Sequence, residues 1–459
     1  MCDGWAVQFI VLPDGCNSSE RGCLPIRAPT IGTTLGDLYK KLRSVKRLRK
    51  AWSVVYRNGM SSKSQETKAI IEEFSLNAET HLARIAKQLL KSKFRFSPSI
   101  GIAVKKPNKP NSKRPLVISP VENRILQRAI LDIIQQIPSI RQIQEANFNY
   151  GGVNEKGVQL AIYHSYDESI KKPYFIKTDI KAFFVNIPRD KALKIITDQI
   201  DDDDFNDILT QATITELDNI ASLGSDKSLF PLEDMGVAQG SCLSPLLCNL
   251  LLHEFDKKMN SRRVRCIRYI DDFILFASSK SSAIKAFDSA KNDLKKFNLD
   301  VYDPRTDKDK AEQGYSKDGF EFLGCHIRPD RIRPADKAVK RLKEKVSEII
   351  SKSLLATSDP SKALKERKTY KDALVEISNT IRGWGNSYAF CTDDQLMQNI
   401  DSAISEKIDN FNLTYKNRLN KLSKADKKRM MGIFLLQDAK KEDANDPKTL
   451  RYVVKHMAK

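Results

Sequence analysis

Apolar residues gather in two short runs around a pair of acids in the second half of the chain. The stretch from Val264 to Ala277 reads VRCIRYIDDFILFA, with Asp271 and Asp272 between the two runs. β-Branched and aromatic residues on either side of turn-forming residues are typical of a β-hairpin. The pattern predicts two strands with both acids at their turn. Aspartates also occur in turns for local reasons, because their side chains bond their own backbone.

A second apolar run ends in another acid. Residues 174–188 read YFIKTDIKAFFVNIP, which predicts a short strand ending at Asp179. This acid could join Asp271 and Asp272 in one cluster. Three packed carboxylates raise one another's pKa, and a divalent cation relieves their repulsion. Oxygen ligands without His or Cys suit Mg²⁺, and two such ions can clamp the oxygens of a phosphoryl transfer. The residues alone therefore indicate metal-assisted phosphoryl or nucleotidyl transfer.

Helical spacing of apolar residues covers much of the remaining chain. The predicted helices are 36–57, a pair within 65–91, 121–137, 284–297 and most of the region after residue 334. Dense turn residues predict a hairpin over 101–117 and two strands around Pro329-Asp330. The four acids at 201–204 could bind a metal, but acids favour a helix N-terminus, and a helix start or an exposed loop is preferred.

Charge indicates a polyanionic partner. The 459 residues include 78 Lys and Arg against 58 Asp and Glu, which gives a net charge of +20 and a pI of about 9.4. Such an excess favours nucleic acid. Seven Lys or Arg lie between Lys40 and Lys50, either as a solvated helix face or as a nucleic-acid contact. No apolar run reaches the roughly 18 residues of a membrane span, so no membrane association is expected.

The arrangement of the cysteines argues against a zinc site and for a reducing environment. The eight cysteines are scattered and include no CxxC pair, which disfavours zinc. Several lie inside apolar runs, as reduced core thiols do. A reducing, cytoplasmic location is therefore expected.

Six motifs in a fixed order resemble those of reverse transcriptases. The chain contains FIKTDIKAFF, GVAQGSCLSPLLCNLLLHEFD, RYIDDFILFA and FEFLGCHI in the family's order. RPLVISPVENRILQRAI upstream and IRGWGNSY downstream resemble the bacterial group II intron-like and retron-like branch. The resemblance covers residues 95–390 in rough terms, and the chain looks most like defence-associated, abortive-infection-like enzymes of the "unknown group".

The resemblance implies an α+β fold, the right-hand polymerase, with fingers, a palm of antiparallel sheet backed by helices, and a helical thumb. The implied parts are an N-terminal extension (1–64), fingers and palm (65–330), thumb (331–400) and a basic C-terminal helical extension (401–459). The implied function is RNA-directed DNA synthesis on a structured non-coding RNA in antiphage defence. A group II intron maturase and a non-catalytic RNA-binding scaffold stay open as alternatives.

The resemblance also assigns roles to individual residues. The catalytic residues are Asp179, Asp271, Asp272 and Lys310, with Lys308 as the alternative to Lys310 as proton donor to pyrophosphate. The metal ligands are Asp179, Ile180, Asp271 and Asp272, which hold two Mg²⁺ ions, or Mn²⁺ in their place. Nucleotide contacts are Lys113, Arg114, Phe184, Gln239 and Gly240. Primer and template contacts are Tyr269, Phe322, Leu323 and Gly324.

The assignment of Phe184 carries a physical argument. A bulky ring at Phe184, under the sugar, would clash with a 2′-hydroxyl and so favour deoxynucleotides, although the ring could instead belong to the core.

The region around Gln239 departs from the family at one position, because this chain has Ala238 where the family usually has Pro. After this loop, Ser244-Pro245 predicts the start of a helix, with Ser as N-cap and Pro as first residue.

The implied partners follow from this function. They are an RNA template, the DNA product and deoxynucleoside triphosphates, without a membrane. A homo-oligomer and a partner protein from a neighbouring gene both stay open.

Overall fold

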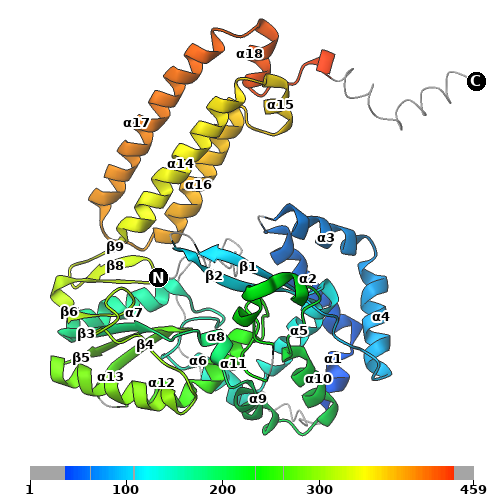
Figure 1. The fold of residues 1–459 in the computed structure, drawn as a ribbon, viewed down its shortest axis with the longest axis vertical. Coiled ribbons are helices and arrows are strands. Elements are labelled where there is room, and N and C mark those ends of the chain that lie inside the picture. Colours follow the sequence, from blue (N-terminus) through cyan, green and yellow to red (C-terminus); the bar gives the residue numbers. More distant parts are fainter. Residues whose placement is uncertain (1–36, 63, 107–108, 233, 262, 439–459) are drawn as a thin grey trace, which may run out of the picture. The chain divides into compact units, whose positions relative to one another are not determined.

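The described chain divides into two compact units. A computed structural model describes residues 37–438, except 63, 107–108, 233 and 262. The first unit ends at Leu323 and the second begins at Gly324. The first mixes helices and strands, whereas the second is mainly helical (Figure 1). The outer parts of the predicted N- and C-terminal extensions lie outside the described residues.

A four-stranded antiparallel sheet is the centre of the first unit, with the order β4-β5-β3-β6. Its strands are β3 (Tyr174–Asp179), β4 (Arg265–Tyr269), β5 (Asp272–Ala277) and β6 (Glu312–Tyr315). The hairpin of β4 and β5 and the end of β3 at Asp179 confirm the two strand predictions made from the apolar runs.

Strand β5 is buried along its whole length. Phe273 and Leu275 belong to the main core, while the Phe276 ring on the other face lies 5.6 Å from the Phe320 ring. Because both faces of β5 are covered, the residues on both faces are apolar. The strand is therefore a continuous apolar run and lacks the alternation of apolar and polar residues that a half-exposed strand has.

Helices cover the sheet and continue beyond it (Figure 1). α7 (Val158–Lys171) packs against β4 and β5, and α13 (Lys280–Lys295) packs against β3 and β5. The other elements of this region are α6 (Pro138–Glu145), α8 (Phe183–Asn186), α9 (Arg189–Thr197), α10 (Asp203–Thr213), η2 (Ile220–Leu229), α11 (Ser244–Leu251), α12 (His253–Met259), η3 (Ser316–Asp318) and β7 (Phe320–Phe322).

The acid run at 201–204 starts a helix, as the sequence predicted. The side chain of Asp202 accepts a hydrogen bond from the Phe205 N–H at 3.0 Å and caps α10. Acids in this first turn also interact favourably with the helix dipole.

The N-terminal part of the first unit is a helical layer and a hairpin. It contains α1 (Leu38–Leu42), α2 (Val45–Met60), α3 (Gln65–Leu76), α4 (Ala78–Leu90), β1 (Ile100–Lys106), β2 (Lys109–Ile118) and α5 (Val121–Ile134). The helix pair, the hairpin and the helix at 121 are confirmed. The single helix predicted over 36–57 is wrong, because the extended backbone of Ser44 (φ −70°, ψ 125°) separates α1 from α2.

The second unit contains a short hairpin followed by helices. Strands β8 (Cys325–Arg328) and β9 (Arg331–Pro334) confirm the turn predicted at Pro329-Asp330. The helices are α14 (Asp336–Ala356), α15 (Pro360–Lys365), α16 (Tyr370–Tyr388), α17 (Asp394–Leu419) and α18 (Lys424–Met430). α14 packs against α16 and α17 around a core that includes Val346, Ile377 and Phe411. α17 runs through the proposed boundary at residue 400. None of the helices in the described ranges combines the length and apolar character needed to cross a bilayer.

We expect the two-sided burial of β5 to dominate the stability of the first unit. Replacing Phe276 by Ala leaves a cavity and should lower the free energy of unfolding by about 3–5 kcal/mol. Ile170→Ala in the same unit is the control, because Ile170 is 55% exposed and its loss should cost less than about 0.5 kcal/mol. Urea-induced unfolding of the full chain measures both, and equal midpoints would contradict the expectation.

Candidate active site

Three predicted acids meet at the ends of β3 and β5. Asp179 is the last residue of β3 and lies opposite Asp272, the first residue of β5. Asp271 precedes it in the two-residue turn from β4 to β5, so only one of the two neighbouring acids lies in the turn. The Ile180 N–H donates to the Asp271 carbonyl oxygen at 3.1 Å and ties the two strand ends together.

Burial and mutual repulsion raise the pKa values of Asp179 and Asp271. For Asp179, burial is the largest cause and the charges of Asp271 and Asp272 follow, so its pKa rises well above the usual range. Burial and the charge of Asp272 raise the pKa of Asp271 to about 7. Asp179 Oδ1 is buried without a hydrogen-bond partner among the described residues. Since such an oxygen is costly in a low-dielectric site, the cluster favours a bound positive charge.

The donor set fits a hard divalent cation. Carboxylates of Asp179, Asp271 and Asp272 are the ligand type that Mg²⁺ and Mn²⁺ prefer, and the orphaned Asp179 Oδ1 is available to one. In the part of the chain that the structure describes, no three His, Cys, Asp or Glu side chains are grouped so as to hold a metal ion. Binding would therefore require the carboxylates to rotate toward one another. Ile180 has only backbone atoms to offer as ligands.

Two lysines and a tyrosine flank the acids. The Tyr302 N–H donates to the Asp179 carbonyl oxygen at 3.2 Å. The Nζ atoms of Lys181 and Lys310 lie 4.8 Å and 5.1 Å from the centre of the Tyr302 ring. The charge of Lys310 lowers the pKa of Asp179 and so opposes the repulsion. The structure thus brings Lys310 to the acids, and it adds Lys181, which sequence reasoning missed although it follows Asp179 by two residues.

The two predicted cations of the β1–β2 hairpin differ in their surroundings. The charge of Arg114 lowers the pKa of Asp271, so the guanidinium acts on the acid cluster. Lys113 Nζ instead forms an ion pair with Asp226 Oδ2 at 2.6 Å. Neighbouring residues of a strand point to opposite faces, which explains the difference.

The predicted Gln239-Gly240 loop packs against β2. The Val117 N–H donates to the Gln239 carbonyl oxygen at 2.8 Å. Gly240 has φ +133°, and a Cβ there would lie 2.3 Å from the Val117 carbonyl oxygen. Glycine is therefore required by the close approach of this chain's own hairpin. Gln239 Oε1 is buried without a partner among the described residues.

The predicted capping role of Ser244 is wrong. Helix α11 begins at Ser244, Leu243 occupies the N-cap, and Pro245 is the second helical residue. The Ser244 hydroxyl donates to the Ala238 carbonyl oxygen at 2.7 Å. The hydroxyl therefore holds the loop that precedes α11 and does not cap the N-terminus of the helix.

Phe184 lies largely in the core. It is 7% exposed, and its ring centre lies 5.7 Å from that of Phe183 in an edge-on arrangement. The Val237 N–H donates to the Phe184 carbonyl oxygen at 2.7 Å. The ring therefore has a packing role, and its contact with a sugar stays a prediction.

The predicted primer contacts lie on both sides of the boundary between the units. Tyr269 pairs with Asp272 across the hairpin, and Phe322 in β7 is buried. Leu323 and Gly324 have φ values of +49° and +84°, so the chain turns sharply there. Contact of these residues with a primer stays a prediction.

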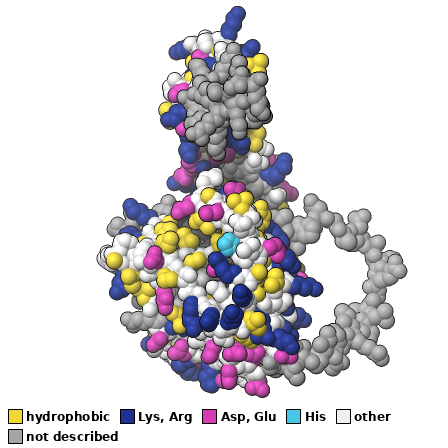
Figure 2. Space-filling model, turned by 90° about the vertical axis from the view of Figure 1, so that its right-hand side faces the viewer, with side chains coloured by type: hydrophobic (Ala, Val, Ile, Leu, Met, Phe, Trp, Pro, Cys, Tyr) yellow, Lys and Arg dark blue, Asp and Glu magenta, His cyan; other side chains and the backbone are white. Residues whose placement is uncertain are grey.

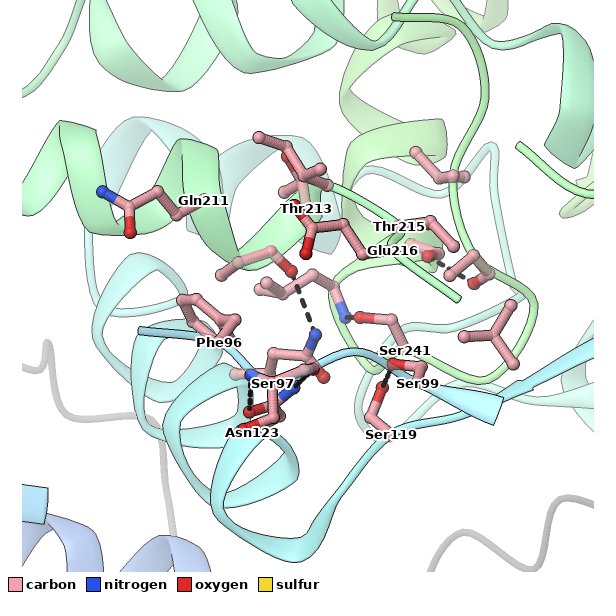
Figure 3. A pocket seen from close by; sticks show the side chains of 18 of the residues that line it. Phe96, Ser97, Ser99, Ser119, Asn123, Gln211, Thr213, Thr215, Glu216 and Ser241 are labelled. Carbon is pink, nitrogen blue, oxygen red and sulfur yellow. Dashed lines mark hydrogen bonds between the residues drawn. The ribbon is translucent and has the colours of Figure 1, made fainter. Parts of the chain in front are cut away.

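A cavity of about 300 Å³ lies elsewhere in the first unit, between the hairpin, α5, α10 and the Gln239 loop (Figure 3). The Asn123 side chain accepts from the Ser97 N–H at 3.2 Å and donates to the Ser97 carbonyl oxygen at 2.7 Å. The hydroxyls of Ser99 and Ser119 are 3.1 Å apart. Because these polar groups bond one another and no predicted site residue lines the cavity, we assign it to packing.

Part of the chain is similar in sequence to known proteins. Residues 104–327 match the sequence family described as reverse transcriptase (RNA-dependent DNA polymerase). Protein YkfC of Escherichia coli (strain K12) is 24% identical over 319 residues, which cover 60% of this chain and 79% of YkfC. Group II intron-encoded protein LtrA of Lactococcus lactis subsp. cremoris is 25% identical over 205 residues, which cover 44% of this chain and 32% of LtrA.

The similarity to longer relatives is partial. An uncharacterized 91 kDa protein in the cob intron of Schizosaccharomyces pombe is 28% identical over 177 residues, which cover 38% of this chain and 20% of that protein. Among solved structures, telomerase from Candida Tropicalis with a fragment of telomeric RNA aligns with a TM-score of 0.40 at 13% identity, over 81% of this chain and 65% of that one. The chain spans about a third or less of the two intron proteins. Residues 104–327, which include the three acids, thus resemble the reverse transcriptase family, and part of the chain is similar to group II intron-encoded protein LtrA.

Proposed function

We propose that the protein extends the 3′-hydroxyl of a primer with deoxynucleotides on an RNA template, with two bound divalent cations. The observation that carries this proposal is the meeting of Asp179, Asp271 and Asp272 at adjacent strand ends within the reverse transcriptase domain. When bound, Mg²⁺ would supply positive charge that lowers the pKa of a 3′-hydroxyl and offsets the negative charge of the phosphates.

The chain's own residues bind and orient the reactants around those acids. Asp179 and Asp271 would hold the cations, with Asp272 in support. Arg114 would bind the triphosphate, because a planar guanidinium contacts phosphate oxygens in pairs. Lys310 would give a proton to the departing pyrophosphate, and its position on the Tyr302 ring holds it near the acids.

Surface charge supports a nucleic-acid partner. On the side of the first unit where α3 and α4 lie, Lys and Arg side chains gather in the middle of the face (Figure 2). Arg49 pairs with Glu79 at 2.7 Å and Arg84 pairs with Glu122. Lys46, Lys50 and Arg57 of α2 are exposed, and no ion pair is found for them among the described residues. Such cations can neutralise phosphates of a template.

The finer biological role is part of the proposal. We propose a structured non-coding RNA as template, a cytoplasmic location and a purpose in antiphage defence, on the strength of the resemblance in sequence. Sequencing the nucleic acid that co-purifies with the protein, with and without phage infection, tests this role. New DNA that depends on Asp271 would support it, and intron RNA alone would favour the maturase alternative.

We expect Asp271→Asn to abolish synthesis while the fold persists. The substitution keeps the shape of the side chain but removes one of the charges that would hold the cations. DNA synthesis on a primed RNA should fall at least about a thousandfold, which corresponds to about 4 kcal/mol, whereas RNA affinity should stay within about twofold. Asp201→Asn is the matched control, since Asp201 is exposed and outside the cluster. Synthesis by the Asp271→Asn protein at the control's rate would refute the site.

The raised pKa values predict how stability changes with pH. A carboxyl whose pKa is higher in the folded than in the unfolded protein binds more protons when folded, so stability falls as pH rises between the two values. With Asp271 raised from 3.8 to about 7, its contribution to this loss is up to about 4 kcal/mol without divalent cations. We therefore expect the melting temperature to fall from pH 4.5 to pH 7.5, and to fall less in Asp271→Asn.

Added Mg²⁺ provides the control for this titration. Cations bind the deprotonated carboxylates, so they should restore more stability at pH 7.5 than at pH 4.5. An identical pH dependence in the wild type and in Asp271→Asn would contradict the raised pKa.

A third prediction concerns the choice of sugar. If Phe184 lies under the sugar, Phe184→Ala should raise the use of ribonucleotides relative to deoxynucleotides by about tenfold or more, because the steric clash is removed. Phe183→Ala is the matched control, since the neighbouring ring is also buried. Both should lower the melting temperature, and only the former should change the ratio of kcat/KM values. A change of equal size in both would mean that Phe184 acts only in packing.

A further inference from the structure

The turn that carries Asp271 has an unfavourable backbone. Ile270, the first residue of this two-residue turn, has φ +60°. Hairpin turns with positive φ at that position strongly prefer glycine. A β-branched residue there is a genuine outlier, and it persists only where the surroundings hold it. The outlier lies directly before a predicted catalytic acid.

A buried guanidinium lies beneath this turn. Arg268 is fully buried, and its Nε and Nη2 donate to Asp256 Oδ1 and Oδ2 at 2.8 and 2.6 Å. Its Nη1 donates both to Asn249 Oδ1 at 3.2 Å and to the Ile270 carbonyl oxygen at 2.8 Å. The side chain therefore joins α11, α12 and the turn through one rigid plane.

A second set of contacts holds the segment at 150–151 against the turn. Asn249 Nδ2 donates to the Gly151 carbonyl oxygen at 2.8 Å. A Cβ on Gly151 would lie 2.7 Å from the Ile270 N atom and 2.4 Å from its Cγ1. The Tyr150 N–H donates to the Arg268 carbonyl oxygen at 2.9 Å. The segment at 150–151 thus lies directly against the turn, and Asn249 holds it there.

We propose that Asn249, Arg268 and Asp256 form a positioning cluster that keeps Ile270 in its left-handed conformation and so fixes Asp271 beside Asp179. The Arg268 bond to the Ile270 carbonyl oxygen acts on the peptide that precedes Asp271. The Ile180 N–H donates to the Asp271 carbonyl oxygen and so connects the next peptide, which follows Asp271, to the end of β3. The inference rests on the proposed function, because it concerns the same acids.

Stability alone gives no reason for this cluster. A buried ion pair is often no more stabilising than apolar side chains of similar volume. Of the four hydrogen bonds that the Arg268 side chain donates, two go to groups outside the ion pair, namely Asn249 and the Ile270 carbonyl oxygen in the turn. The bonds therefore set a geometry that apolar side chains could not set.

The test compares two buried asparagines. Asn249 and Asn123 are 3% and 4% exposed, and each bonds backbone or side-chain groups of a distant segment, but Asn123 does not contact the turn. For one nucleotide added to a primed RNA, Asn249→Ala should lower kcat by about tenfold or more, with KM for the nucleotide within about threefold. Asn123→Ala should lower the melting temperature but leave kcat within about twofold.

A second substitution separates positioning from folding. Ile270→Gly adopts the positive φ without strain. In the Asn249→Ala background it should recover kcat by about threefold or more, because the turn then needs less support. Equal loss of kcat in both asparagine variants, or no recovery from Ile270→Gly, would overturn the positioning role.

Hydrogen exchange gives a readout that needs no catalysis. The peptide covering residues 264–277 should exchange faster in Asn249→Ala than in the wild type or in Asn123→Ala, and Ile270→Gly should reverse part of the change. Unchanged exchange would overturn the inference even if kcat falls. If the wild type makes no DNA under any condition, the proposed function fails, and exchange alone decides whether the cluster holds the turn.

Discussion

Repulsion among three clustered carboxylates is the constraint on which the first unit depends. Asp179 and Asp272 face each other because β3 and β5 pair in that register, and Asp271 follows from the turn. A shift of the register by one residue would turn these side chains to the other face and expose the apolar ones. The two-sided burial of β5 therefore holds the acids together as firmly as it holds the core.

Compensation for this repulsion comes from elements that are far apart in the sequence. Lys310, whose Nζ lies over the Tyr302 ring, lowers the pKa of Asp179. Arg114 acts on Asp271 from the β1–β2 hairpin. These cations offset part of the repulsion, while Asp179 Oδ1 stays without a hydrogen-bond partner among the described residues.

The sequence predicted what local patterns encode. The apolar runs around Asp271 and before Asp179 specify strands, because burial on a sheet selects apolar, β-branched and aromatic residues. The role of Ser244 was mispredicted, since the Ala238 carbonyl oxygen in the preceding loop accepts from its hydroxyl. Asn249 was missed because its bond to Gly151 spans 98 residues and leaves no periodic signal. Roles beyond the acids depended on resemblance, because the chemistry of one side chain does not reveal its substrate.

The contact of Gly240 with Val117 has a mechanical consequence. The loop and strand β2 share a hydrogen bond and a backbone approach that leaves no room for a Cβ atom. Strand β2 and the Gln239-Gly240 loop must therefore move together. Any displacement of β2 at Val117 would therefore move Gln239 and Gly240 with it, so the two nucleotide contacts of the proposed function, at Arg114 and at Gln239, would be coupled through the backbone.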